Sequence, residues 1–112
     1  GFVTYSKEAK HELLGIDDDL LDRNEAVSEP VARAMAEGAL ARSKAELAIA
    51  VTGFAGPAED GCEEGLVHFA LARRDGETAH RVEHFGPLGR GPVRVRSLKT
   101  MLDMLEEALA QA

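Results

Sequence analysis

Apolar and polar positions alternate along the chain in patterns that predict a series of short elements. Residues 7–14 predict a helix, because Ser6 can cap its first turn and Gly15 can adopt the left-handed conformation that ends helices. The carboxylates at 17–19 predict a second helical turn, since negative charge favours the positive end of a helix. The apolar and β-branched stretch 2–5 predicts the end of a strand.

A longer helix is predicted over residues 28–42. Ser28 can cap it, and Glu29 and Pro30 both suit a first helical turn. Helical spacing groups one set of side chains on a face: Val31, Met35, Ala39 and Arg42, with Ala34, Gly38 and Ala41 beside them. Because this face carries few bulky side chains, we expect it to lie close against a sheet or a twin helix.

Strand patterns fill the middle of the chain, and a helix pattern ends it. Residues 46–52 predict a buried strand, because 47–51 are apolar without alternation, as in the central strands of parallel sheets. Residues 66–73 and 78–85 predict an antiparallel pair, because Asp75-Gly76 favours a tight turn between them. Residues 93–110 predict an amphipathic helix, whose apolar face would comprise Leu98, Met101, Leu102, Leu105, Ala108 and Leu109. The whole pattern predicts a single α/β domain.

Composition and charge narrow the classes of function. The 112 residues include 13 Lys and Arg against 20 Asp and Glu, which gives a net charge of −7. This charge repels phosphate backbones and anionic lipid, so we expect neither nucleic acid nor a membrane as a partner. Apolar runs are too short for a membrane helix, and the single cysteine, Cys62, excludes an internal disulfide. We therefore expect a cytoplasmic protein.

The first group of candidate functional residues lies where the predicted strand 2–5 meets the first helix. Tyr5 offers a hydroxyl, and Lys10 lies one helical turn beyond Ser6. A partly buried lysine can lose its proton and activate a hydroxyl nucleophile. The alternative is structural: Ser6 caps the helix, Lys10 is solvated and Tyr5 packs against the core.

The second candidate follows the predicted strand 46–52. Thr52 offers a hydroxyl, and Gly53, Ala55 and Gly56 would let a ligand approach the backbone N–H groups. The pattern is neither a Walker loop nor a dinucleotide fingerprint. It is compatible with an anion or oxyanion cradle and equally with a tight turn that leaves the strand.

The third candidate is a group of arginines at the start of the last helix: Arg90, Arg94 and Arg96. Guanidinium groups and the helix dipole together suit a phosphate, although these arginines could also be a solvated face that compensates Glu83. The four histidines lack a zinc-binding spacing, and Cys62 has neither a paired cysteine nor a basic neighbour. We therefore expect no metal site and no cysteine nucleophile.

These segments, taken in order, resemble the C-terminal domain of the competence/damage-inducible CinA family, the nicotinamide mononucleotide (NMN) deamidases. The resemblance covers nearly the whole chain. It rests on segments within 1–15, 26–38, 51–57, 65–67 and 90–94, which read GFVTYSKEAKHELLG, AVSEPVARAMAEG, VTGFAGP, GLV and RGPVR.

The resemblance implies a three-layer α/β domain, with a mixed sheet flanked by helices, that hydrolyses the carboxamide of NMN. The products would be nicotinate mononucleotide and ammonia, and no metal or cofactor would be needed. Lys10 would be the base or proton relay and Tyr5 a supporting hydroxyl. Thr52, Gly53, Ala55 and Gly56 would line the substrate site, and Arg90 would hold the phosphate. A homo-oligomer is also expected.

This sequence departs from the family pattern at several points. Lys7 stands where the family usually has Asn, and the loop Ala58–Glu64 is short and acidic. The family's nucleophilic serine lies in a Thr-Glu-Ser-Cys-Thr-Gly-Gly segment that does not occur in residues 1–112. We expect that segment, with the domain's first strand and helix, to precede Gly1. The alternative is a non-catalytic nucleotide-binding or competence/damage-associated module.

Overall fold

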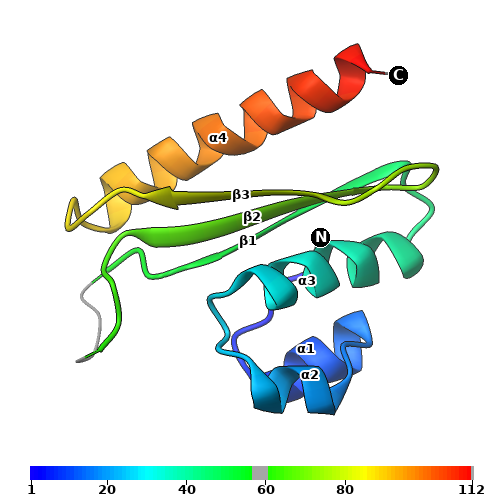
Figure 1. Cartoon of the computed structure of the whole chain (residues 1–112), viewed down its shortest axis with the longest axis horizontal. Helices are drawn as coiled ribbons and strands as arrows, with labels where there is room; N and C mark the ends of the chain where they lie inside the picture. Colours follow the sequence, from blue (N-terminus) through cyan, green and yellow to red (C-terminus); the bar gives the residue numbers. More distant parts are fainter. Residues whose placement is uncertain (57–60, 112) are drawn as a thin grey trace.

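The computed structural model describes residues 1–56 and 61–111 and arranges them in three layers. In chain order the elements are α1 (Lys7–Leu14), α2 (Asp18–Arg23), α3 (Glu29–Ala41), β1 (Leu47–Gly53), β2 (Leu66–Arg73), β3 (Ala79–His84) and α4 (Arg90–Ala110). The sheet has the order β1-β2-β3; α4 covers one face, α3 covers the other, and α1 and α2 lie beyond α3 (Figure 1). The predicted three-layer α/β class is confirmed.

The two faces of the sheet carry side chains of different size. Alternation along β2 directs Val67, Phe69 and Leu71 toward α4, where they pack with Val93 and Met104. On the other face, alanines from both elements meet, namely Ala50, Ala70 and Ala72 from the sheet and Ala32 and Ala36 from α3; Leu40 joins them near the end of the helix. Because these side chains are short, α3 can lie close to the sheet.

Helix α3 is buried on two sides, and the predicted face packs against helices. Val31, Met35 and Ala39 lie in the cluster with α1 and α2, which agrees with the predicted close contact with another helix. The small residues that face the sheet are Ala32 and Ala36. Val31 is fully buried on the other side, against Leu14 and Leu21 of α1 and α2. A face judged from one helix alone cannot show which side the second layer will cover.

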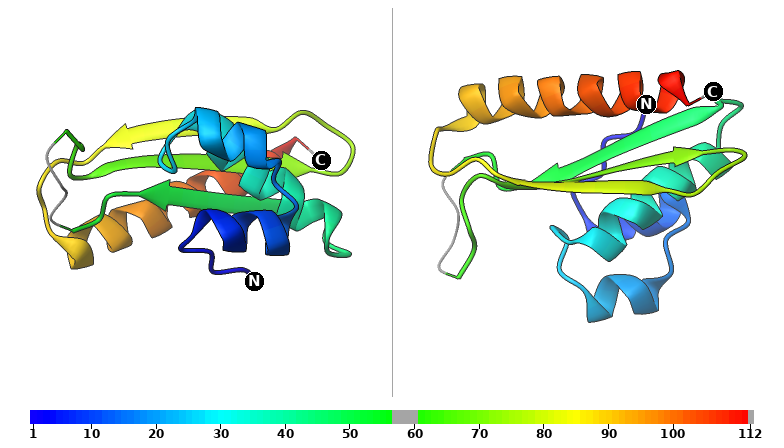
Figure 2. Two further views of the ribbon diagram at one scale, coloured as in Figure 1. Left: turned by 90° about the horizontal axis from the view of Figure 1, so that it is seen from below. Right: turned by 45° about the horizontal axis from the view of Figure 1, so that its top comes forward.

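One predicted strand is absent, and the strand predicted over 46–52 is present as β1 but is not a central strand of a parallel sheet. Residues 2–5 form no strand, and the N-terminal segment lies beside the β1 edge of the sheet (Figure 2). Strand β1 is an antiparallel edge strand of the described sheet, paired from Leu47↔Arg73 to Gly53↔Val67. Its uninterrupted apolar sequence arises because helices cover both faces of the sheet, which also happens in antiparallel sheets.

Helix α4 begins at Arg90, three residues before the predicted start. Half of its predicted apolar face is confirmed, because Met101, Leu105 and Ala108 lie in the cluster between the sheet and α4. Leu98, Leu102 and Leu109 are exposed by 56%, 51% and 64%, although all three belong to the predicted apolar face. The buried residues are Val93, Ser97, Thr100, Met104 and Ala108. None of the helices in residues 1–56 and 61–111 is both long and apolar enough to cross a membrane.

The predicted ends of the first helices are confirmed. Ser6 Oγ accepts a hydrogen bond from the Ala9 N–H at 3.0 Å, and Gly15 closes α1 with a φ of 67°. Ser28 precedes α3 as predicted but makes no cap bond; its hydroxyl donates to the Glu25 carbonyl at 2.7 Å. Local sequence therefore sets most helix ends, even where it misplaces the buried face.

Candidate active site

Parts of all three candidate groups meet in one groove, between the end of β1 and the first half of α4. Its volume is about 350 Å³, within the range of about 300–1,000 Å³ that is usual for small-molecule sites. The lining residues are Tyr5, Val51, Gly53, Ala55, Val67, Val93, Arg94, Ser97, Leu98 and Met101. An apolar floor with a few polar groups at its rim suits a flat organic ring that carries charged substituents.

Tyr5 is exposed and Lys10 is buried, which is the reverse of the structural alternative, in which Tyr5 packs against the core and Lys10 is solvated. Tyr5 does not pack in the core; it is 93% exposed and lines the groove. Lys10 is not solvated; it is 6% exposed, and its Nζ donates to the Thr4 carbonyl at 3.1 Å. Lys10 does not line the groove, but its bond fixes the residue next to Tyr5.

The surroundings of Lys10 disfavour its charged form. Among residues 1–56 and 61–111, no carboxylate lies within 4.0 Å of its Nζ. Burial lowers the pKa of Lys10 from its ordinary value, because the charged form loses hydration. A buried lysine without a carboxylate partner is suited to accept and return a proton.

The end of β1 and the segment after it contribute Gly53 and Ala55 to the groove. The N–H of Phe54 donates to the Leu66 carbonyl at 3.0 Å, so the antiparallel pairing continues past Gly53. A Cβ at position 53 would lie 2.8 Å from the Leu66 carbonyl oxygen, which explains the glycine there. Ala55 packs against the cluster between the sheet and α4.

Thr52 lies on the other side of the sheet. Its hydroxyl donates to the Ala26 carbonyl at 3.0 Å, in the segment that precedes α3. Gly53 lines the groove, whereas Thr52 does not, because successive residues of a strand point to opposite faces. Of the predicted substrate-binding residues, the groove contains Gly53 and Ala55.

Arg90 and Arg94 bring positive charge to this end of α4. Arg94 lines the groove, and the Arg90 guanidinium lies against Gly56, where a Cβ would be 2.7 Å from its Cζ. The alternative, in which these arginines compensate Glu83, is not seen: within the described ranges, no carboxylate lies within 4.0 Å of Arg90, Arg94 or Arg96. The first turn of a helix adds unbonded N–H groups, which also favour an anion.

Sequence reasoning missed Ser97, which lines the groove and is 9% exposed. A usable signal exists in the chain, since Val93, Ser97 and Thr100 recur at the helical spacing and all three are buried. The sequence prediction instead followed the leucines of the adjacent stripe. Arg94 was recognised as part of an arginine cluster but not as a residue of the substrate site.

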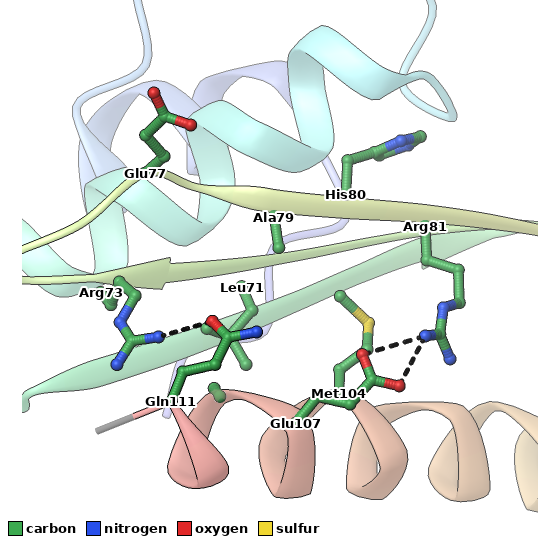
Figure 3. Close-up of a pocket in the computed structure, with 10 residues that line it drawn as sticks. Leu71, Arg73, Glu77, Ala79, His80, Arg81, Met104, Glu107 and Gln111 are labelled. Atoms are coloured by element: carbon green, nitrogen blue, oxygen red, sulfur yellow. Dashed lines mark hydrogen bonds and ion pairs between the residues drawn. The ribbon is translucent and has the colours of Figure 1, made fainter.

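Other parts of the described chain offer weaker sites. No group of three or more His, Cys, Asp or Glu side chains within residues 1–56 and 61–111 could hold a metal ion. A second cavity, of about 120 Å³, lies between the sheet and the end of α4 (Figure 3). Its two arginines are already engaged: Arg81 binds Glu107 at 3.0 Å, and Arg73 binds Gln111 at 3.4 Å.

The chain is similar in sequence to proteins of one family. The model of the CinA C-terminal domain family matches residues 1–109. A CinA-like protein of Mycobacterium marinum is 45% identical over 114 aligned residues, which cover 99% of this chain and 26% of that protein. The chain thus spans about a quarter of the length of such curated relatives.

Solved structures of proteins that are similar in sequence have a closely similar fold. The competence/damage inducible protein CihA from Agrobacterium tumefaciens is 43% identical, with a TM-score of 0.89 over 96% of this chain and 66% of that one. The competence damage-inducible protein A from Klebsiella pneumoniae is 38% identical, with a TM-score of 0.86 and the same coverage.

Proposed function

This chain belongs to the CinA C-terminal domain family, and from that premise we propose that it is part of an amidohydrolase that converts NMN to nicotinate mononucleotide and ammonia. The observation that carries the proposal is the groove between β1 and α4, in which Tyr5, Gly53 and Arg94 meet although they are far apart in sequence. The groove has an apolar floor for a pyridine ring and a cationic end for a phosphate.

The chemistry requires a nucleophile, a base and a site for the developing oxyanion. In the family the nucleophile is a serine of the Thr-Glu-Ser-Cys-Thr-Gly-Gly segment, whose hydroxyl attacks the carboxamide carbon. Ammonia leaves, and water then hydrolyses the resulting ester to nicotinate mononucleotide. Backbone N–H groups of Gly53, Ala55 and Gly56 would stabilise the oxyanion, whereas that of Phe54 already donates to the Leu66 carbonyl.

Lys10 is the residue that we assign to proton transfer. Its burial and its lack of a carboxylate partner among the described residues support this role, because a base must be neutral before it accepts the serine proton. Tyr5, placed at the groove and next to the Thr4 carbonyl that Lys10 binds, would assist the transfer.

We assign the phosphate of NMN to Arg90, with Arg94 beside it. The contact between Arg90 and Gly56 places a guanidinium at the loop, and the start of α4 adds the positive end of a helix dipole. This local charge allows an anion to bind a chain whose net charge is −7.

The test is ammonia release from NMN by the natural full-length protein that contains this chain. We expect turnover, and we expect Lys10→Ala to reduce it strongly while the circular dichroism spectrum remains that of the parent. A Lys10→Ala protein with full activity would remove Lys10 from the mechanism. Calorimetric binding of NMN without ammonia release would favour the alternative, a non-catalytic nucleotide-binding module.

A further inference from the structure

Two histidines of neighbouring strands are joined on the α3 side of the sheet. His68 Nδ1 and His80 Nε2 are 2.9 Å apart, and their ring centroids are 5.2 Å apart. His80 points away from the α4 side, toward which Arg81 of the same strand projects (Figure 3). The second ring nitrogen of His80, Nδ1, lies 3.5 Å from Glu29 Oε1 in the first turn of α3. The three side chains thus connect β2, β3 and α3.

The position of the Glu29 carboxylate indicates which ring nitrogens carry protons. Nδ1 of His80 faces the Glu29 carboxylate, so the favourable tautomer has its proton there. Nε2 of His80 is then an acceptor, and His68 donates to it from Nδ1. In this arrangement both imidazoles are neutral, and Nε2 of His68 is unprotonated.

Charged groups face this arrangement from several elements. Helix α3 contributes Glu29 and also Arg33, whose Nε donates to Glu29 Oε2 at 2.8 Å. Strand β3 contributes His84, which lies close enough to affect the titration of His68. His84 itself bonds Glu63 at 2.6 Å. One carboxylate therefore faces the histidine pair directly, and its charge is shared with Arg33.

Acid acts on the pair in two steps. The first proton can bind Nε2 of His68 and leave the bond between the two rings intact. The second proton must bind Nε2 of His80, the acceptor of the bond between the rings. His68 Nδ1 and His80 Nε2, 2.9 Å apart, then both carry a proton. The bond is then lost, and two imidazolium charges repel each other; the two sites titrate as a coupled pair.

We propose that Glu29, His80 and His68 form a pH-sensitive latch that fixes the first turn of α3 to the β2–β3 hairpin at neutral pH and releases it in mild acid. The latch does not depend on the proposed amidohydrolase activity, because none of its residues lines the groove at Tyr5. It lies behind that site, since His68 is in register with Thr52, which binds the segment preceding α3.

Linkage gives the direction of the effect. Burial lowers the pKa of both imidazoles; His80 lowers that of His68 further, and Glu29 partly opposes the effect on both. In the unfolded chain histidine titrates near pH 6.5, so that state binds more protons than the folded state once the pH falls below this value. The stability is therefore full above about pH 6.5 and is lost as the pH falls through the lowered pKa values.

The test is urea denaturation of the protein between pH 7.5 and 5, with a chelator present, for the parent and three variants. Each extra proton bound by the unfolded state raises the unfolding constant about tenfold per pH unit. We expect His68→Gln and His80→Gln to flatten this dependence, each by up to about tenfold per pH unit. Arg81→Gln, next to His80 on β3, is the matched control: Arg81 projects toward α4 and does not titrate in this range, so this variant should keep the parent's slope (Figure 3).

Two measurements on the parent protein keep the proposal testable if a variant does not fold. Nitrogen-15 NMR should show the Nδ1–H tautomer for His68 and His80 at pH 7.5, with titration midpoints below those of ordinary histidine. Exchange of the Ala32 amide, which donates to the Ser28 carbonyl in the first turn of α3, should accelerate between pH 7.5 and 5.5 relative to the end of that helix, after correction for the intrinsic rate. An Nε2–H tautomer for His80, ordinary midpoints for both rings, or unchanged exchange at α3 would each overturn the latch.

Discussion

Replacing Gly56 by alanine would separate a role of Arg90 in binding from a role in folding. The new Cβ would lie 2.7 Å from both Cζ and Nε of Arg90, so the guanidinium has to move away from the loop. The displaced group is the end of a flexible side chain, and Gly56 is not among the glycines with positive φ. We therefore expect the free energy of unfolding to change by less than about 1 kcal/mol.

The effect on binding should be much larger. A hydrogen bond to a charged group contributes about 1.5–3 kcal/mol, which corresponds to a rise of about 10- to 150-fold in the KM for NMN. The assay is steady-state ammonia release with NMN and with nicotinamide riboside, which lacks the phosphate. Gly56→Ala and Arg90→Ala should raise the KM for NMN alone and leave kcat nearly unchanged.

Gly53→Ala is the matched control for a change that disturbs the fold. Its Cβ would lie 2.8 Å from the Leu66 carbonyl oxygen, a backbone atom that cannot turn aside. We expect a loss of about 1–3 kcal/mol in stability, seen as a lower urea midpoint. An unchanged KM for NMN in both Gly56→Ala and Arg90→Ala would refute the phosphate role of Arg90, as would equal losses for the two substrates.

Three further predictions concern proton transfer, packing and assembly. Activity should rise with pH through the pKa of Lys10, which burial holds below its ordinary value, and Lys10→Ala should abolish that limb of the profile; a rise that persists in the variant would contradict the assignment. Gly38→Ala should cost about 1–3 kcal/mol in urea denaturation because its Cβ would meet the Leu14 carbonyl, whereas Gly91→Ala, which meets nothing within 4 Å, should cost far less. Sedimentation velocity should show a homo-oligomer, as the family resemblance implies, and a monomer at all concentrations would reject that expectation.

Much of the candidate site was predictable because its residues stand at junctions that sequence marks well. Tyr5 precedes a helix with a recognisable cap, and Gly53 follows an apolar strand. Their meeting with Arg94 in one groove was not predictable, because it requires the end of β1 and the first half of α4 to lie at the same end of the sheet. Thr52 shows the limit most clearly: one residue from Gly53, its side chain lies on the opposite face.

Features that depend only on neighbours within a few positions follow from the sequence alone. The Ser6 cap and the Gly15 end of α1 follow from a hydrogen bond and a backbone angle that involve neighbouring residues. The turn at Asp75-Gly76 lies in the connection 74–78, where the Gly76 N–H donates to the Arg73 carbonyl at 3.4 Å. The hairpin of β2 and β3 was therefore located almost to the residue.

Only the tertiary structure decided which sides of these elements are buried. Helix α4 exposes Leu98 and buries Ser97, and Lys10 lies inside although lysines are usually solvated. The pairing of His68 with His80 likewise depends on the register of two strands. Burial and contact across elements depend on the partner surface, and the pattern within one helix or strand does not contain that surface.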